Sequence, residues 1–155
     1  MLFRSLADVF EMAMHLERNG REFYSAAADR AEEGRVKELL SELVEWERRH
    51  EELFGDMRDI AVSSGAAIAE GSEAAAYVHA VVDGRIFKHR DEALARLTGE
   101  STEEEILDMA IELETSAVLF FLGIRELAGQ GKEKIDAIIA EEMRHVCMLS
   151  EQMAS

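Results

Sequence analysis

The sequence has 155 residues, of which 48% are hydrophobic and 32% charged, and it contains no proline. These values exclude a disordered chain and favour one globular, all-α domain built from long helices. The formal net charge of −16 argues against nucleic acid and against an anionic membrane, and the lone cysteine excludes an intramolecular disulfide and a cysteine-rich iron or zinc site.

The N-terminal residues do not have the pattern of a signal peptide. Asp8 and Glu11 interrupt the apolar side chains at this end. No apolar run in the sequence approaches the roughly 20 residues that span a bilayer. We therefore expect one domain over residues 1–155 and a cytoplasmic protein without a membrane partner.

Two long helices are expected in the first part of the chain. The first runs from about Ser5 to Ala31, and Glu17 lies within its apolar stripe. After a break near Gly34, the second runs from about Val36 to Val62. Because the connection is short, the two helices should be antiparallel neighbours.

The stretch 63–100 is rich in glycine and small residues, and we expect one or two short helices within a crossover that runs between the ends of a bundle. Ser101–Glu104 reads as a capping box, which would start a third long helix that ends near Ala128. The Gly129–Gly131 turn then leads into a fourth helix that ends near Gln152.

The motif Glu-x-x-His occurs twice, once in the second long helix and once in the fourth. Glu47 precedes His50 by three residues, and Glu142 precedes His145 by three. Residues at this spacing share one face of a helix, and in both helices that face is otherwise apolar. A carboxylate in an apolar core needs compensation of its charge, which a metal ion provides while it also binds the imidazole.

The two halves of the chain repeat each other. The third helix aligns on the first at an offset of 97 residues, and the fourth aligns on the second at an offset of 95. The alignment pairs Glu17 with Glu114, Glu47 with Glu142, and His50 with His145. Two helical hairpins related by a pseudo-twofold axis would bring these six residues together. Glutamate is common in this chain, so one Glu-x-x-His match could arise by chance, but the matched offsets of all six residues are much harder to explain in that way.

Four glutamates and two histidines in this arrangement are typical of a ferritin-like four-helix bundle that binds two iron or manganese ions. Four carboxylates carry a charge of about −4, which two divalent ions neutralise. Iron is the metal we expect, with manganese or a mixed pair as alternatives, because the same oxygen and nitrogen ligands accept each of them. The competing interpretation is solvated glutamates and ordinary core histidines.

The sequence resembles the rubrerythrin branch of the ferritin-like superfamily, and in particular its compact members without a rubredoxin domain. The resemblance rests on Leu16-Glu17 followed by Phe23-Tyr24, Glu47 with His50, Glu114 at the end of Ala110–Glu114, and Glu142 with His145. It implies that Glu47 and Glu142 bridge two metal ions, that Glu17 and Glu114 are terminal ligands, and that each histidine binds one ion. It also implies a function in oxidative stress and a homodimer.

Three features of the sequence depart from this family. Ala117 stands where rubrerythrins carry an additional glutamate, and Phe121 stands where they carry a tyrosine. Tyr24 therefore remains as the inward phenol, and it either hydrogen-bonds near the ligands or packs in the core. Cys147 should be a buried, inert thiol. Without a cysteine-rich iron centre, electrons must come from an external donor.

The leading prediction is a non-haem di-iron oxidoreductase that reduces hydrogen peroxide, or oxidises ferrous iron with dioxygen or peroxide. One alternative is a protein that binds or sequesters iron without catalytic turnover. The other is a metal-free helical module that binds a partner protein.

Overall fold

The computed structural model describes the backbone of residues 3–69, 71–82 and 87–155, with the side chains of all of these except 87–91. Over these residues the chain forms helices and no strand, which confirms the all-α prediction. The helices are α1 Leu6–Arg30, α2 Arg35–Ser64, α3 Glu73–Val81, α4 Phe87–Arg96, α5 Glu103–Leu127 and α6 Lys132–Ala154.

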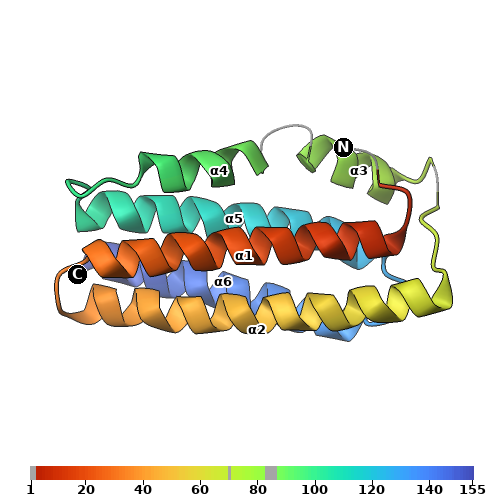
Figure 1. The fold of residues 1–155 in the computed structure, drawn as a ribbon, viewed down its shortest axis with the longest axis horizontal. Helices are drawn as coiled ribbons and strands as arrows, with labels where there is room; N and C mark the ends of the chain where they lie inside the picture. The colour runs from red at the N-terminus through yellow and green to blue at the C-terminus, as the bar shows by residue number, and fades with distance from the viewer. Residues whose placement is uncertain (1–2, 70, 83–86) are drawn as a thin grey trace.

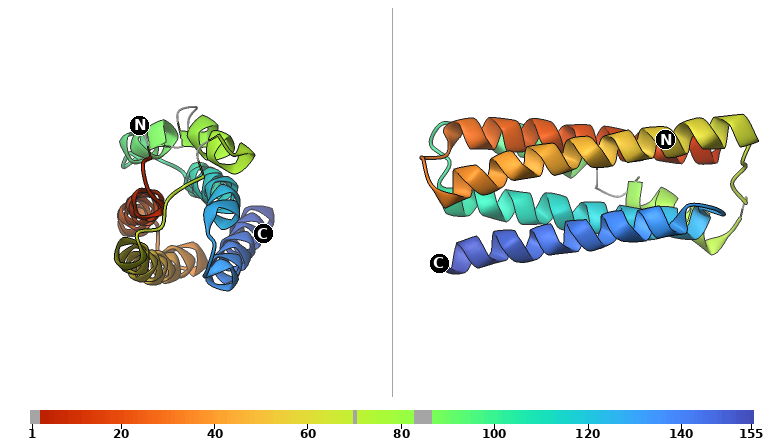
Figure 2. Two further views of the ribbon diagram at one scale, coloured as in Figure 1. Left: turned by 90° about the vertical axis from the view of Figure 1, so that its right-hand side faces the viewer. Right: turned by 90° about the horizontal axis from the view of Figure 1, so that it is seen from below.

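Four long helices, α1, α2, α5 and α6, lie side by side as a bundle (Figures 1 and 2). The most extensive contacts join α1 to α2 and α5 to α6, so the bundle consists of the two predicted hairpins. The short helices α3 and α4 lie along one side of the bundle, against α5 and α1. They carry the chain from the end where α2 stops to the opposite end where α5 begins, as the predicted crossover requires.

The helix ends follow from local sequence. Ser5 caps α1 through a reciprocal capping box with Asp8. Gly65 ends α2 with a φ of 63°, a left-handed conformation that glycine adopts without strain. The cap of α5 is one residue later than predicted: the side chain of Thr102, not Ser101, accepts from the backbone N–H of Glu105. The extended backbone at Thr102 puts its hydroxyl in the capping position, which sequence spacing alone did not distinguish.

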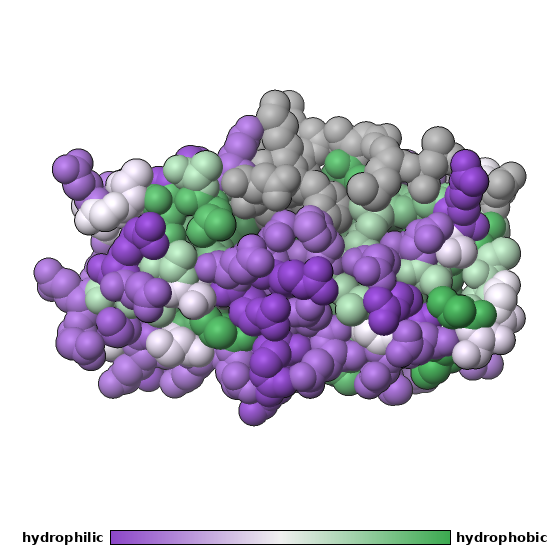
Figure 3. Space-filling view, in the orientation of Figure 1, coloured by the Kyte–Doolittle hydropathy of each residue, from purple (hydrophilic) through white to green (hydrophobic). Residues whose placement is uncertain are grey.

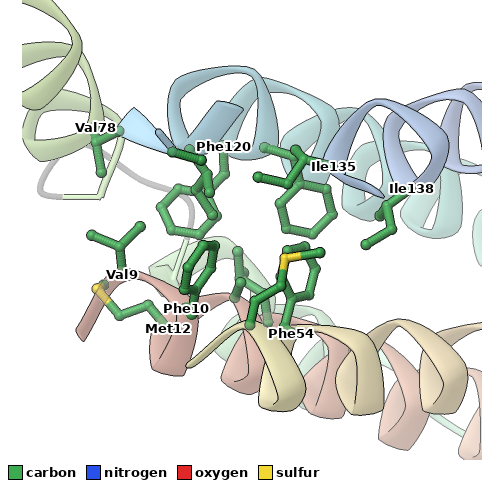
Figure 4. Close-up of a cluster of buried hydrophobic side chains, with 14 of the residues drawn as sticks. Val9, Phe10, Met12, Phe54, Val78, Phe120, Ile135 and Ile138 are labelled. Atoms are coloured by element: carbon green, nitrogen blue, oxygen red, sulfur yellow. The ribbon is translucent and has the colours of Figure 1, made fainter. Parts of the chain in front are cut away.

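The core consists of two apolar clusters, one toward each end of the bundle. The first gathers side chains from both hairpins, and Figure 4 shows Phe10 and Phe54 facing Phe120 and Ile135. The second contains Phe23, Leu39, Leu40, Leu43, Ile106, Leu113 and Leu149. On each of the four long helices, one cluster ends and the other begins at the predicted ligand positions, so a polar layer separates the two clusters.

The outward face of α6 differs from the prediction at Cys147, which is exposed rather than buried. This residue follows His145 by two positions, which turns it to the opposite side of the helix.

The face in Figure 3 is largely hydrophilic, in keeping with the net charge of −16. Among the described helices, none combines the length and the apolar character needed to cross a membrane.

Helix α3 is fixed against α5 at a close contact around Gly123. A β-carbon at this glycine would lie 2.7 Å from Val78 Cγ2 and 2.8 Å from the Tyr77 ring. The Tyr77 hydroxyl donates to the carbonyl oxygen of Leu119 at 2.7 Å, one turn away on α5. Glycine at 123 therefore allows the crossover to pack closely on the bundle.

We predict that Gly123→Ala lowers the free energy of unfolding by about 1–2 kcal/mol, because the overpacking cost exceeds the gain in helix propensity. Gly55→Ala is the matched control on α2. Its added β-carbon would lie 3.4 Å from the flexible end of Met14, and we expect a gain of up to about 1 kcal/mol. Urea unfolding measures both, and equal stabilisation of the two variants would contradict the close contact.

Candidate metal centre

The polar layer in the middle of the bundle contains all six residues that the sequence singled out. Glu17 comes from α1, Glu114 from α5, and each Glu-x-x-His pair from α2 or α6. Each of the six side chains is at most 2% exposed. Burial of four carboxylates at this depth is costly unless their charge is compensated.

The six side chains form two groups that share two members. One group is Glu17, Glu47, His50 and Glu142, and the other is Glu47, Glu114, Glu142 and His145. Within each group, one ligand atom from every residue lies within 4.8 Å of the others. Glu47 and Glu142 belong to both groups, which is the position that a carboxylate bridging two metal ions would occupy.

The ring of His50 lies between two carboxylates of α6. Its Nδ1 atom is 3.0 Å from Glu142 Oε1 and 3.7 Å from Glu17 Oε2, so it faces the layer. Its Nε2 atom is 2.6 Å from Glu141 Oε2 on the outer side. Hydrogen bonds from both nitrogens require the doubly protonated ring, so the metal-free site holds an imidazolium here.

The charges of the layer explain the pKa values at this histidine. Burial lowers the pKa of His50, but the hydrogen bond and charge of Glu142, with smaller effects from Glu47 and Glu141, raise it to about 9. Burial raises the pKa of Glu142, yet the nearby imidazoles of His145 and His50 outweigh that effect and hold this pKa below its usual range. Glu142 is therefore ionised at neutral pH.

The second half of the layer has a different set of partners. His145 Nδ1 lies 3.5 Å from Glu142 Oε2 and 3.7 Å from Glu114 Oε1, so it also faces the layer. The Tyr24 hydroxyl donates to Glu114 Oε1 at 2.7 Å, which places the phenol next to a predicted ligand rather than in a purely apolar contact. The centroids of the His50 and His145 rings are 6.2 Å apart, and the ring planes are inclined by 28°.

Comparisons with known proteins agree with this arrangement. A solved structure from Thermotoga maritima, described as a candidate ferritin-like diiron-carboxylate protein, matches 100% of this chain over 99% of its own. The TM-score is 0.72 and the sequence identity is 22%. The chain has the ferritin-like fold. No protein-family model and no curated protein sequence matches it.

The donor set of this ferritin-like bundle fits a pair of metal ions. Buried atoms of the layer that have no hydrogen-bond partner among the described residues include Glu114 Oε2, Glu142 Oε2 and His145 Nδ1. All three atoms belong to residues of the second ligand group, and His145 Nδ1 lies 3.5 Å from Glu142 Oε2 within the layer. Carboxylate oxygen and imidazole nitrogen suit iron and manganese, and two divalent ions would neutralise the four carboxylates.

Two further residues lie beside the candidate metal site, and their contacts with its histidines were not predicted from the sequence. Glu141 contacts His50, and Trp46 lies with its ring centroid 5.6 Å from that of His145 and 6.2 Å from that of His50. Arg49 lies over the outer face of the indole at 5.1 Å. Trp46 and Glu141 each directly precede a Glu-x-x-His motif. This sequence position is the signal that could have placed them near the predicted ligands.

We predict that Glu142→Ala abolishes binding of the metal pair, because this carboxylate belongs to both groups of ligands. Glu47→Ala should act in the same way. Elemental analysis after purification without chelators measures the metal content. Glu151→Ala, an exposed glutamate on α6, is the control and should keep the metal content of the wild type. Unchanged stoichiometry in both ligand variants would contradict the assigned site.

The affinity for divalent metal should rise with pH between about 6.5 and about 9, because the ion displaces the proton on His50 Nδ1. Since the folded metal-free protein raises the pKa of His50, the stability contributed by that proton is present in full below pH 6.5 and is lost as the pH passes about 9.

Calorimetry in buffers of different ionisation enthalpy measures the proton release near neutral pH, and we expect about one proton from His50. An affinity that is constant over this pH range, without proton release, would show that His50 does not bind the metal.

Proposed function

We propose that this chain binds two iron ions in its polar layer and is a non-haem di-iron oxidoreductase. The observation that carries the proposal is the sharing of Glu47 and Glu142 between two buried ligand groups. The ferritin-like fold, and the description of the Thermotoga maritima protein as a candidate diiron-carboxylate protein, support it. Manganese, or one ion of each kind, would satisfy the same ligands.

Each residue of the layer has a distinct task in this proposal. Glu47 and Glu142 would hold both ions. Glu17 and His50 would complete the ligands of one ion, and Glu114 and His145 those of the other. The hydroxyl of Tyr24 fixes the orientation of Glu114 by donating to Oε1.

The apolar clusters on both sides of the layer keep bulk water away from the site. Phe54, Phe121 and Ile138 close it on one side, and Leu43, Leu113 and Leu149 close it on the other. Exclusion of water strengthens the electrostatic attraction between the carboxylates and bound cations. Ala117, at 1% exposure, supplies no further carboxylate, so the six ligands are the full set that the described residues offer.

When bound here, two ferrous ions would supply the two electrons that, with two protons, reduce hydrogen peroxide to two molecules of water or dioxygen to hydrogen peroxide. An external electron donor would be needed to restore the ferrous state. This donor, the cytoplasmic location and the homodimer are parts of the proposal that rest on sequence reasoning.

The activity test is steady-state consumption of hydrogen peroxide by the iron-loaded protein. We expect about one peroxide consumed per pair of ferrous ions without reductant, and repeated turnover when a reductant is supplied. Glu142→Ala should lose both reactions and Glu151→Ala should keep both. A single oxidation without turnover would indicate iron binding or sequestration instead, and a protein that binds no iron would indicate a metal-free helical module.

A further inference from the structure

The pseudo-twofold symmetry of the six ligands does not extend to the residues around them. At the offset that pairs Glu47 with Glu142, Trp46 pairs with Glu141. At the offset that pairs Glu17 with Glu114, Tyr24 pairs with Phe121. The polar residues Glu141 and Tyr24 thus each correspond to an aromatic residue of different chemistry in the opposite hairpin.

Glu141 gives the His50 half a carboxylate behind its imidazole. Its Oε2 atom lies 2.6 Å from His50 Nε2, and its side chain is 27% exposed while the ring is 1% exposed. When Nδ1 binds a metal ion, Nε2–H donates to this carboxylate. The bond fixes the tautomer and the ring orientation, and the negative charge makes Nδ1 a stronger donor to the metal.

The His145 half lacks such a carboxylate within the part of the chain that the structure describes. Among the described residues, the carboxylate contacts of His145 run through Nδ1, which faces the layer, and the ring centroid of Trp46 lies 5.6 Å from that of His145. An indole offers an N–H donor and no acceptor oxygen, so it cannot replace the role of Glu141.

A hydrogen bond in the other half acts on a terminal carboxylate. The phenol of Tyr24 donates to Glu114 Oε1 at 2.7 Å and withdraws negative charge from this ligand of the His145 half. Glu141 therefore strengthens a donor of the His50 half, whereas Tyr24 weakens a donor of the His145 half.

From this geometry we propose that the two halves of the site bind metal ions in order, with the Glu17 and His50 half filled first, and that Glu141 is the positioning residue that sets this order. The inference rests on the proposed metal pair. The proposal concerns a difference in metal affinity between the two halves of the site. The six ligands alone are arranged symmetrically and would not produce such a difference.

Calorimetric titration of the metal-free protein with Co²⁺ tests the order of binding. The wild type should bind in two steps of different affinity. Glu141→Ala should weaken the tighter step by roughly 10–100-fold and leave the weaker step nearly unchanged. Glu141→Gln keeps an acceptor oxygen without the charge, so its tighter step should have an affinity between those of the wild type and Glu141→Ala. Glu151→Ala is the charge-matched control on the same helix and should titrate like the wild type.

The reciprocal variant Trp46→Glu places a carboxylate at the pseudo-symmetric position, next to the guanidinium of Arg49. It should strengthen the weaker step by roughly tenfold and bring the two affinities together. Thermal unfolding of each metal-free variant shows that the fold is retained. A structural defect would weaken both steps, whereas the proposal requires one step to change.

Two results would overturn the proposal while leaving the metal pair intact. One is a wild type that binds two Co²⁺ ions with a single affinity, and the other is a Glu141→Ala variant that titrates like the wild type or weakens both steps equally. A wild type that binds no Co²⁺ at all would overturn the metal pair together with the order of binding.

Discussion

The structure depends on the burial of four carboxylates and two imidazoles in one layer of an otherwise apolar bundle. Such a layer opposes folding unless its charge is compensated, and the histidines compensate only part of it. In the metal-free protein, His50 holds an extra proton between Glu142 and Glu141, which is why its pKa rises to about 9 in spite of burial. Two divalent cations would complete the compensation and displace that proton.

The rest of the bundle positions this layer. Two hairpins of one design contribute three ligands each, and the apolar clusters at both ends fix the helices so that the ligands meet. The crossover through α3 and α4 lets the second hairpin return in the orientation that the pseudo-twofold axis requires, and the contact at Gly123 holds α3 against α5. Stability and site geometry therefore depend on the same interhelical contacts.

Much of this architecture could be predicted from the sequence because periodicity and repetition are strong signals. The Glu-x-x-His pairs and the offsets of 97 and 95 residues indicated which six side chains would meet, and the structure brings all six together. The start of α5 was wrong by one residue, since Ser101 and Thr102 both can cap a helix. The contacts of Glu141 and Trp46 could not be predicted, because they depend on how α2 and α6 rotate against each other.

The most direct measurement for the central claim is anomalous diffraction at the iron edge from crystals of the protein loaded with ferrous iron. We expect two iron peaks roughly 3.5–4 Å apart, both within coordination distance of Glu47 and Glu142, one beside His50 and the other beside His145. A single peak, or peaks outside the polar layer, would contradict a bridged pair held by these six residues.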